Sequence, residues 1–426
     1  MESHDHGHSH HHGGHSHTHE PGHTHHPGQV HDHIHTHAPA RNHDSGGAPG
    51  SRRDFLRMLM GGTLAGASVL ELAYHRAAWA RAAAPANDGY LFDIQKAAEG
   101  VYFAQARPQA ILNCNAAIFV RSKDVVVVDA HSKPSAAASI IRQIRREITD
   151  KPVRYVINTH FHWDHTQGDH AYTTTGSKVD IIASSMTKHL MEELAVTRME
   201  ASRDAVPGQI EAMRLRAEKA ASAAEKAFCA DQIRQLQAYQ ADIKDFHLEL
   251  PTITFDKSYL LADPALDLHL EFHGRSHTAG DVFAFCPQRR ALAAGDAIQG
   301  WLPNIADGYP RLWPGTIDEV AKADFRYLMG GHGPMQSDSR TVMTSVRNYI
   351  EELAEKVEAG KKAGLTLAEM QARLTVASLK SMQSNGYQQY LERTLAASHP
   401  HFGPMPPLQN DVNGNISDVY KNLDRA

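Results

Sequence analysis

One short stretch constrains this chain more than any other. It is Thr159-His160-Phe161-His162-Trp163-Asp164-His165, and it directly follows Val153–Ile157, an apolar segment with the pattern of a short strand. Residues two apart on an extended chain point the same way, so His160 and His162 can close on one ion. As the chain turns, Asp164 and His165 aim elsewhere and can take a second ion. Four metal-competent side chains in six residues predict a metal centre.

A second piece supplies a third imidazole for the first ion. His277 lies just past a predicted strand over residues 266–272, and its neighbours Thr278 and Asp281 can form a tight, hydrogen-bonded turn. His273 is the competing candidate. It is only one place past the strand and lacks these flanking residues, so the sequence favours His277.

Two further pieces again follow apolar segments. Asp296 lies just past the predicted strand over 291–294, and a carboxylate there can bridge two cations. His332 lies within Gly330-Gly331-His332-Gly333-Pro334, where glycines let the backbone turn sharply and come close to a ligand. We expect His332 to complete the second ion's ligands. The alternative for each residue alone is a polar turn residue.

Asp129 stands at the end of the predicted strand Val125–Val128. A buried carboxylate needs partners, and we interpret Asp129 as a residue that orients the first motif's loop or a ligand imidazole. The alternative is an N-cap for the helix predicted after Ser132.

The chain around these motifs alternates between strand and helix patterns. A turn signal at 122–124 separates Ala116–Val120 from Val125–Val128, as in a hairpin, and apolar residues at helical spacing predict a helix over 135–148. Further strands are predicted over 101–104, 181–183, 252–255, 266–272, 282–285 and 291–294.

Residues 187–247 differ, because they are rich in strong helix formers. Pro207-Gly208 predicts a break, so we expect two or three long helices inserted in the α/β body. The insertion can cover the pocket or form a homodimer interface; the alternative is a surface decoration. Helices are also expected from residue 339 onward, including 346–358 and 367–374 with a capping box at Thr366 and Glu369, whereas the Pro- and Asn-rich stretch 399–415 predicts a loop.

The order of motifs resembles that of the metallo-β-lactamase-fold hydrolases, over roughly residues 90–360. The resemblance implies an α/β fold, a four-layer αβ/βα sandwich with the metals at one edge. It assigns His160, His162 and His277 to one ion and Asp164, His165 and His332 to the other, with Asp296 bridging. We expect a domain over 85–338 carrying the helical insertion, followed by a helical C-terminal extension over 339–426.

The ligand set with Asp296 is similar to that of glyoxalase II and lactonases, whereas true β-lactamases of this fold carry Cys or Ser there. Cys286 lies ten residues too early to substitute. The resemblance implies a binuclear hydrolase in which a metal-bridging hydroxide attacks an ester, thioester, lactone or amide carbonyl, with Asp164 orienting it. Zinc is the default metal, and iron or manganese suits the same ligands. A β-lactamase and an iron-dependent redox protein of the same fold are the alternatives.

Composition bounds the partners. The formal net charge of -5 argues against a nucleic-acid binder, and three distant cysteines argue against a disulfide scaffold or a thiolate zinc site. We expect a small-molecule substrate. Trp163, Trp301, Tyr309 and Trp313 either line its pocket or belong to the core.

The first 84 residues are predicted to be a disordered tract and an export signal rather than part of the folded domain. Residues 1–50 hold a His-rich tract, interpreted as disordered, which either binds metal loosely or has no selected role. Over 51–84, Arg52-Arg53 precedes Phe55 and a short apolar run, which resembles a twin-arginine signal peptide. The run is too short for a stable membrane span. We therefore expect export to the periplasm through the twin-arginine machinery of a bacterium. A metal-handling protein, in which the tract is the function, is a further alternative.

Overall fold

A computed structural model describes residues 90–107, 114–337, 339–396 and 406–425. The His-rich tract and the predicted export signal lie outside these ranges. Within them, no helix is both long enough and apolar enough to cross a membrane.

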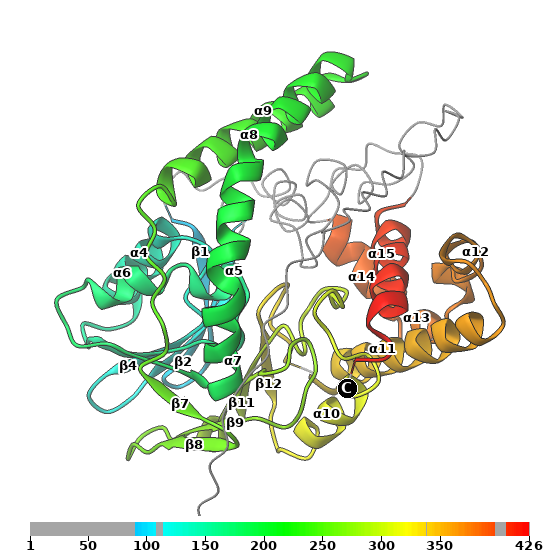
Figure 1. The fold of residues 1–426 in the computed structure, drawn as a ribbon. Coiled ribbons are helices and arrows are strands. Elements are labelled where there is room, and N and C mark those ends of the chain that lie inside the picture. The colour runs from blue at the N-terminus through cyan, green and yellow to red at the C-terminus, as the bar shows by residue number, and fades with distance from the viewer. Residues whose placement is uncertain (1–89, 108–113, 338, 397–405, 426) are drawn as a thin grey trace, which may run out of the picture. The chain divides into compact units, whose positions relative to one another are not determined.

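The first sheet has seven strands in sequence order, antiparallel from β1 to β4 and parallel from β4 to β7 (Figure 1). The predicted hairpin is present, with Val120 paired to Val125. The strands are β1 (Phe92–Ala98), β2 (Val101–Ala106), β3 (Ala116–Val120), β4 (Val125–Val128), β5 (Val153–Ile157), β6 (Asp180–Ser184) and β7 (Ile253–Phe255).

The second sheet has five strands in the order β12-β11-β10-β9-β8. Only β11 and β12 run parallel, so both point their carboxyl ends toward the same edge. The strands are β8 (Ser258–Leu261), β9 (Leu268–Glu271), β10 (Phe283–Cys286), β11 (Ala291–Gly295) and β12 (Tyr327–Gly330). The strands β1, β8 and β12 were not predicted. β9 is shorter than the predicted 266–272, because only residues 268–271 pair with β8 or β10.

The two sheets pack face to face over one apolar layer. Phe103, Phe119 and Val126 of the first sheet share this cluster with Leu270 and Ala284 of the second. The outer face of the first sheet is covered by α4 (Pro134–Gln143) and α6 (Asp169–Thr173), and that of the second by α10 (Trp313–Val320) and α11 (Ser339–Lys362). The four-layer αβ/βα sandwich expected from the sequence is therefore present.

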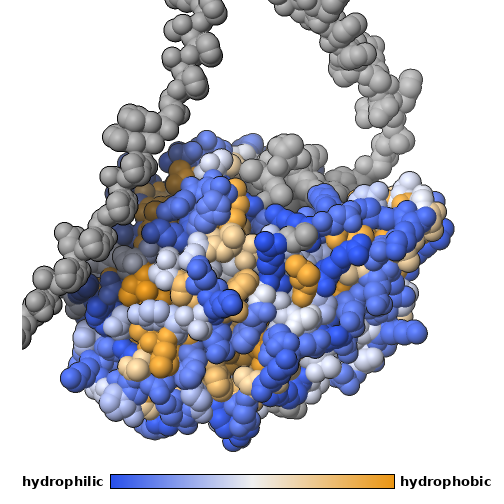
Figure 2. Space-filling model, turned by 60° about the horizontal axis from the view of Figure 1, so that its bottom comes forward, coloured by the Kyte–Doolittle hydropathy of each residue, from blue (hydrophilic) through white to orange (hydrophobic). Residues whose placement is uncertain are grey.

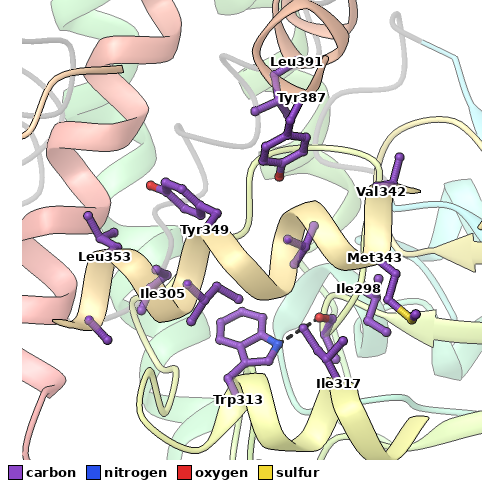
Figure 3. Close-up of a cluster of buried hydrophobic side chains, with 14 of the residues drawn as sticks. Ile298, Ile305, Trp313, Ile317, Val342, Met343, Tyr349, Leu353, Tyr387 and Leu391 are labelled. Atoms are coloured by element: carbon purple, nitrogen blue, oxygen red, sulfur yellow. Dashed lines mark hydrogen bonds between the residues drawn. The ribbon is translucent and has the colours of Figure 1, made fainter. Parts of the chain in front are cut away.

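The layer outside the second sheet is built around Trp313 (Figure 3). Its ring is fully buried near Ile305, Ile317 and Tyr349, and its Nε1 donates a hydrogen bond to the carbonyl of Ala297 at 2.9 Å. Of the two roles considered for this tryptophan, the structure shows the core one.

The insertion is a helical hairpin in which α8 (Val196–Lys219) and α9 (Ala223–Asp242) lie side by side (Figure 1). It follows α7 (Ser185–Leu190) and a π-helical turn, Met191–Ala195. The predicted break at Pro207-Gly208 is wrong, because α8 runs through Pro207. Val206 and Ile210 flank the proline and pack on Leu236 and Tyr239 of α9, which offsets the lost backbone hydrogen bond. The turn comes later, where Ser222 caps α9.

The C-terminal helices pack on the second sheet through α11, with the predicted capping box at the start of α12 (Leu367–Arg373). α13 (Lys380–Gln383) and α14 (Tyr387–Ala396) follow. The predicted loop over 399–415 is wrong from residue 407, where α15 (Pro407–Asn422) begins. Leu408, Val412, Ile416 and Val419 recur at helical spacing and are buried, and Pro407 occupies the first turn, where a proline is tolerated.

The predicted helix over 135–148 is present in two parts, because α4 continues as a π-helix over Ile144–Ile148.

On the face shown in Figure 2, hydrophobic residues form small areas separated by hydrophilic ones. The large hydrophobic side chains that the described residues expose are dispersed over several elements: Met186, Val196, Leu215, Leu260 and Leu312. A homodimer through the insertion stays a prediction.

Candidate metal centre

The predicted ligands meet where several strands end. β5 leads into the loop with His160 and His162 and then into α5 (Trp163–Thr166). Asp296 directly follows β11, and His332 follows β12 after one intervening residue, Gly331. His277 comes from the turn between β9 and β10. All seven side chains are buried: His160, His162, Asp164, His165, His277, Asp296 and His332.

Their donor atoms fall into three overlapping groups, in each of which the atoms lie within 4.8 Å of one another. The groups are His160, His162 and His277; His160, His165 and Asp296; and Asp164, His165 and His332. The first and third match the two ligand sets expected from the sequence. The second joins them through Asp296, the residue expected to bridge.

Each of four imidazoles is held by a hydrogen bond on its outward side. Nδ1 of His160 contacts the Thr159 hydroxyl at 3.0 Å, and Nδ1 of His277 contacts the carbonyl of Asn304 at 3.0 Å. Nε2 of His162 lies 2.8 Å from Asp307, and Nδ1 of His165 lies 2.8 Å from Asp129. A ring whose outward nitrogen donates in this way presents a lone pair on the other nitrogen.

The inward nitrogens are correspondingly close. Nδ1 of His162 and Nε2 of His277 are 3.0 Å apart. Oδ2 of Asp164 lies 3.1 Å from Nε2 of His332, and Oδ2 of Asp296 lies 3.2 Å from the same atom. The other oxygen of Asp296 is 3.4 Å from Nε2 of His165. Oδ2 of Asp296 also lies 3.8 Å from Nε2 of His277, so Asp296 faces imidazoles of both outer groups.

Asp129 connects the two halves of the centre. Its carboxylate accepts from the backbone N–H of Thr159 at 2.9 Å, from the Thr159 hydroxyl at 3.1 Å and from Nδ1 of His165. Because Thr159 in turn contacts His160, one carboxylate positions imidazoles of both groups. The N-cap alternative for Asp129 is wrong, since the N-cap of α4 is Lys133 without a side-chain cap.

Asp281 fixes the turn that carries His277. It accepts hydrogen bonds from the backbone N–H of Thr278 at 2.8 Å, from the Thr278 hydroxyl at 2.6 Å and from Ser276. Burial raises the pKa of Asp281 to about 6, against the lowering effect of these hydrogen bonds. Thr278 and Asp281 therefore close the turn, as their spacing predicted, and contact no inward nitrogen.

The electrostatics divide the centre into two halves. Burial and the neighbouring His162 lower the pKa of His277 to about 4, and burial and His165 lower the pKa of His160 well below its ordinary value. Burial acts to raise the pKa of Asp164 and of Asp296, but the adjacent imidazoles outweigh it and hold both well below the ordinary range. These pKa shifts favour neutral imidazoles at His160 and His277 and charged carboxylates at Asp164 and Asp296.

His165 shows how strongly the carboxylate half attracts positive charge. Burial acts to lower its pKa, but Asp164 and the other surrounding acids raise it well above the ordinary value of an imidazole. The acids around His165 therefore favour positive charge in this half of the centre. A divalent cation satisfies the same charge when bound.

The residues fit a metal. The buried atoms Nε2 of His160, Nε2 of His165, Oδ2 of Asp164 and Oδ1 of Asp296 make no hydrogen bond. Gly331 leaves the space between them open, because a Cβ there would lie 2.2 Å from Oδ1 of Asp296 and 2.7 Å from Cε1 of His165. Imidazole and carboxylate together are ligands of zinc, iron and manganese.

Sequence reasoning missed three residues that hold the centre in place. Asp307 is buried and binds His162 on one side and Arg198 of α8 on the other. Asn115 donates to the carbonyls of Gly330 and Gly333 and so ties the His332 loop to the first sheet. None of the three residues, Asp307, Arg198 and Asn115, lies in a recognisable motif. The only local signal is the pair Asp307-Gly308, which is typical of a turn.

The segment 303–307 carries both Asn304 and Asp307, and the last helix supports it. Asn415 of α15 donates to the carbonyl of Pro303 at 2.8 Å. Asn422 donates to the carbonyls of Ile305 and Ala306, at 3.1 and 2.7 Å. Two metal-facing imidazoles, His162 and His277, thus depend on a segment held from the C-terminal end.

The competing candidates lie elsewhere. His273 pairs with Glu271 at 3.0 Å, and Cys286 lies between the sheets beside Gln288. Among the aromatic residues, the Trp301 ring stacks on His332 with centroids 5.3 Å apart, whereas Trp163 packs on Tyr239 of the insertion. The guanidinium groups of Arg275 and Arg425 each lie 5.3 Å from the centroid of the Tyr309 ring.

Comparison with known proteins assigns the family. The sequence model described as the metallo-beta-lactamase superfamily matches residues 111–332, which is more than half of the chain. The chain therefore belongs to the metallo-beta-lactamase superfamily.

Two solved structures are similar to this chain. A metallo-beta-lactamase from Pontibacter korlensis is 18% identical, with 60% of this chain and 98% of that one covered and a TM-score of 0.43. A stereoselective inverting sec-alkylsulfatase from Pseudomonas sp. is 17% identical, with 78% of this chain covered and a TM-score of 0.54. This chain spans half the length of the alkylsulfatase. The second likeness supports the fold.

Proposed function

We propose that the chain is a binuclear metal-dependent hydrolase that cleaves an ester, thioester, lactone or amide of a small molecule. The observation that carries the proposal is the set of three overlapping donor groups, all buried and all aimed inward. His160, His162 and His277 would hold one ion. Asp164, His165 and His332 would hold the other, with Asp296 between them.

Bound divalent ions would supply a Lewis acid and lower the pKa of a water molecule enough for attack at neutral pH. The protein's part is to hold the geometry and the proton. Oδ2 of Asp164 faces the centre, 3.1 Å from Nε2 of His332, so we assign it the orientation of the attacking water and the acceptance of its proton. Zinc is the proposed metal because imidazoles outnumber carboxylates in the donor set.

The test is a hydrolysis panel on protein of measured metal content: lactones, thioesters, aryl esters, β-lactams, phosphodiesters and sulfate esters. Sulfate esters are included because an alkylsulfatase shares the fold. Turnover should follow metal content and disappear in Asp296→Ala, which should also lose bound metal. Asp256→Ala, at an exposed site, is the matched control. Turnover that persists in metal-depleted protein or in Asp296→Ala would refute the proposal. Iron in the purified protein together with dioxygen consumption would favour the redox alternative.

We also propose that the chain is exported to the periplasm. The support is the pair Arg52-Arg53 before Phe55 and a short apolar run. Arg52→Lys with Arg53→Lys preserves the charge and should keep the protein in the cytoplasm, whereas Arg57→Lys should not. Equal periplasmic yield of the paired variant and the control in cell fractionation would refute export by this route.

A further inference from the structure

We propose that Arg198, in the helical insertion, is a positioning residue of the metal centre. It holds Asp307 against Nε2 of His162 and thereby fixes the ring whose Nδ1 faces the proposed metal. The inference rests on the proposed function, because it assigns the insertion a part in the same centre.

The first step is the ion pair. Arg198 donates from both terminal nitrogens to Asp307, at 2.7 Å to Oδ2 and 3.0 Å to Oδ1. Only 4% of the Asp307 side chain is exposed, against 24% for Arg198. A solvated ion pair on the surface would contribute little to stability, whereas this is a bidentate ion pair with a buried carboxylate.

The second step is the imidazole. Oδ2 of Asp307 also lies 2.8 Å from Nε2 of His162, so this one oxygen contacts both the guanidinium and the ring. The contact fixes the proton on Nε2 and leaves the lone pair on Nδ1, which lies 3.0 Å from Nε2 of His277. Burial acts to raise the pKa of Asp307, but the bonds to His162 and Arg198 lower it below the ordinary range.

The third step is how the insertion is anchored. Trp163, the residue after His162, joins the apolar cluster of Val206, Leu236 and Tyr239 between α8 and α9. The Tyr239 hydroxyl donates to Gln167 at 3.0 Å, just beyond α5. The hairpin therefore packs on Trp163 and Gln167, and Arg198 of the same hairpin binds the carboxylate that holds the His162 ring.

The guanidinium also lies over the ring of Phe161, with Cζ 5.0 Å from the ring centroid. A planar fork can make the two bonds to Asp307 and this stacking contact at once, whereas a lysine ammonium cannot. Because both terminal nitrogens are engaged by Asp307, the geometry favours positioning over the binding of an anionic substrate.

The experiment measures Zn²⁺ binding to the full-length, metal-depleted protein by competition with a chromophoric chelator. Arg198→Met should weaken the Zn²⁺ site that includes His162 by about 10- to 100-fold, the range typical of residues behind a metal ligand. Arg198→Lys should recover only part of this loss. Arg214→Met, on the same helix but in an exposed pair with Glu211, is the matched control and should bind as the wild type does.

Arg198→Met can also destabilise the fold, because it leaves Asp307 buried without its counter-ion. The paired variant Arg198→Met with Asp307→Asn removes that charge. If Arg198 acts through Asp307, the paired variant loses no more Zn²⁺ affinity than Asp307→Asn alone.

The outcomes separate the two hypotheses. Wild-type protein that binds no Zn²⁺ at micromolar concentrations would overturn the proposed function itself. Wild-type binding with unchanged affinity in Arg198→Met would leave the proposed function standing and overturn the role of Arg198. Losses in Arg198→Met and Asp307→Asn that add in the paired variant would overturn the route through Asp307.

Discussion

Asp129→Asn tests the claim that one carboxylate organises both halves of the centre. The backbone at Asp129 is left-handed, with φ of 70°, and asparagine tolerates that conformation, so the change isolates the carboxylate. Asp129 receives hydrogen bonds from three donors: the Thr159 N–H, the Thr159 hydroxyl and Nδ1 of His165.

An amide cannot accept from all three. With its oxygen toward His165, its NH₂ group faces the Thr159 N–H, a buried contact between two donors. With the amide flipped, the NH₂ group faces Nδ1 of His165 and forces the proton onto Nε2, the nitrogen that faces Asp296. Either arrangement loses at least one hydrogen bond to a charged group, which is worth about 1.5–3 kcal/mol.

We therefore expect the metal-free variant to lose about 2–3 kcal/mol in the free energy of unfolding, measured by denaturant titration. Its Zn²⁺ affinity, measured by chelator competition, should fall by about 10- to 100-fold. Asp150→Asn, at an exposed site, is the control. A variant that keeps both the wild-type unfolding free energy and the wild-type Zn²⁺ affinity would show that Asp129 does not hold the centre together.

Three further predictions follow from the described geometry. Gly331→Ala should abolish Zn²⁺ binding with little change in secondary structure by circular dichroism, because its Cβ would lie 2.2 Å from Oδ1 of Asp296; wild-type affinity would contradict this. Trp313→Ala should cost about 3–5 kcal/mol of unfolding free energy, against little for the exposed Leu312→Ala, and a loss under 1 kcal/mol would show that the cluster re-packs. Asp263 accepts from Ser122, Ala265 and Leu266, and these bonds outweigh burial and lower its pKa to about 2. Its stabilising contribution is therefore present above pH ~4 and lost as the pH falls toward 2. The free energy of unfolding of the wild type should exceed that of Asp263→Asn by about 1 kcal/mol at pH 5, after allowance for solvent screening, and by less at pH 3. A difference in unfolding free energy that stays the same at both pH values would show that the charge of Asp263 is not its source.

The sequence predicted the parts of the fold that local pattern determines. Val125–Val128 and Val153–Ile157 were predicted to the residue, because each is a short apolar run bounded by turn signals. Most residues of the edge strands β1 and β8 are exposed or half-buried, without regular alternation, so their pairing depends on neighbouring strands that the local sequence does not indicate.

The candidate site divides in the same way. The seven inward side chains stand at strand ends in recognisable short motifs, and the structure brings them together. Arg198 and Asp307 are 109 residues apart, and each is an ordinary charged residue in its local sequence. Only packing of the insertion against the segment 303–307 makes them partners, so no spacing rule could have predicted the pair.

The supports from α15 have a consequence for the order of events during synthesis. The segment that steadies His162 and His277 receives bonds from Asn415 and Asn422. A ribosome-bound chain carries every proposed ligand once residue 332 has emerged, yet the two rings reach their final support only some ninety residues later. A metal ion can therefore bind to the fully supported site only after α15 has been translated. Truncation of α15 should weaken metal binding although the helix contains no ligand.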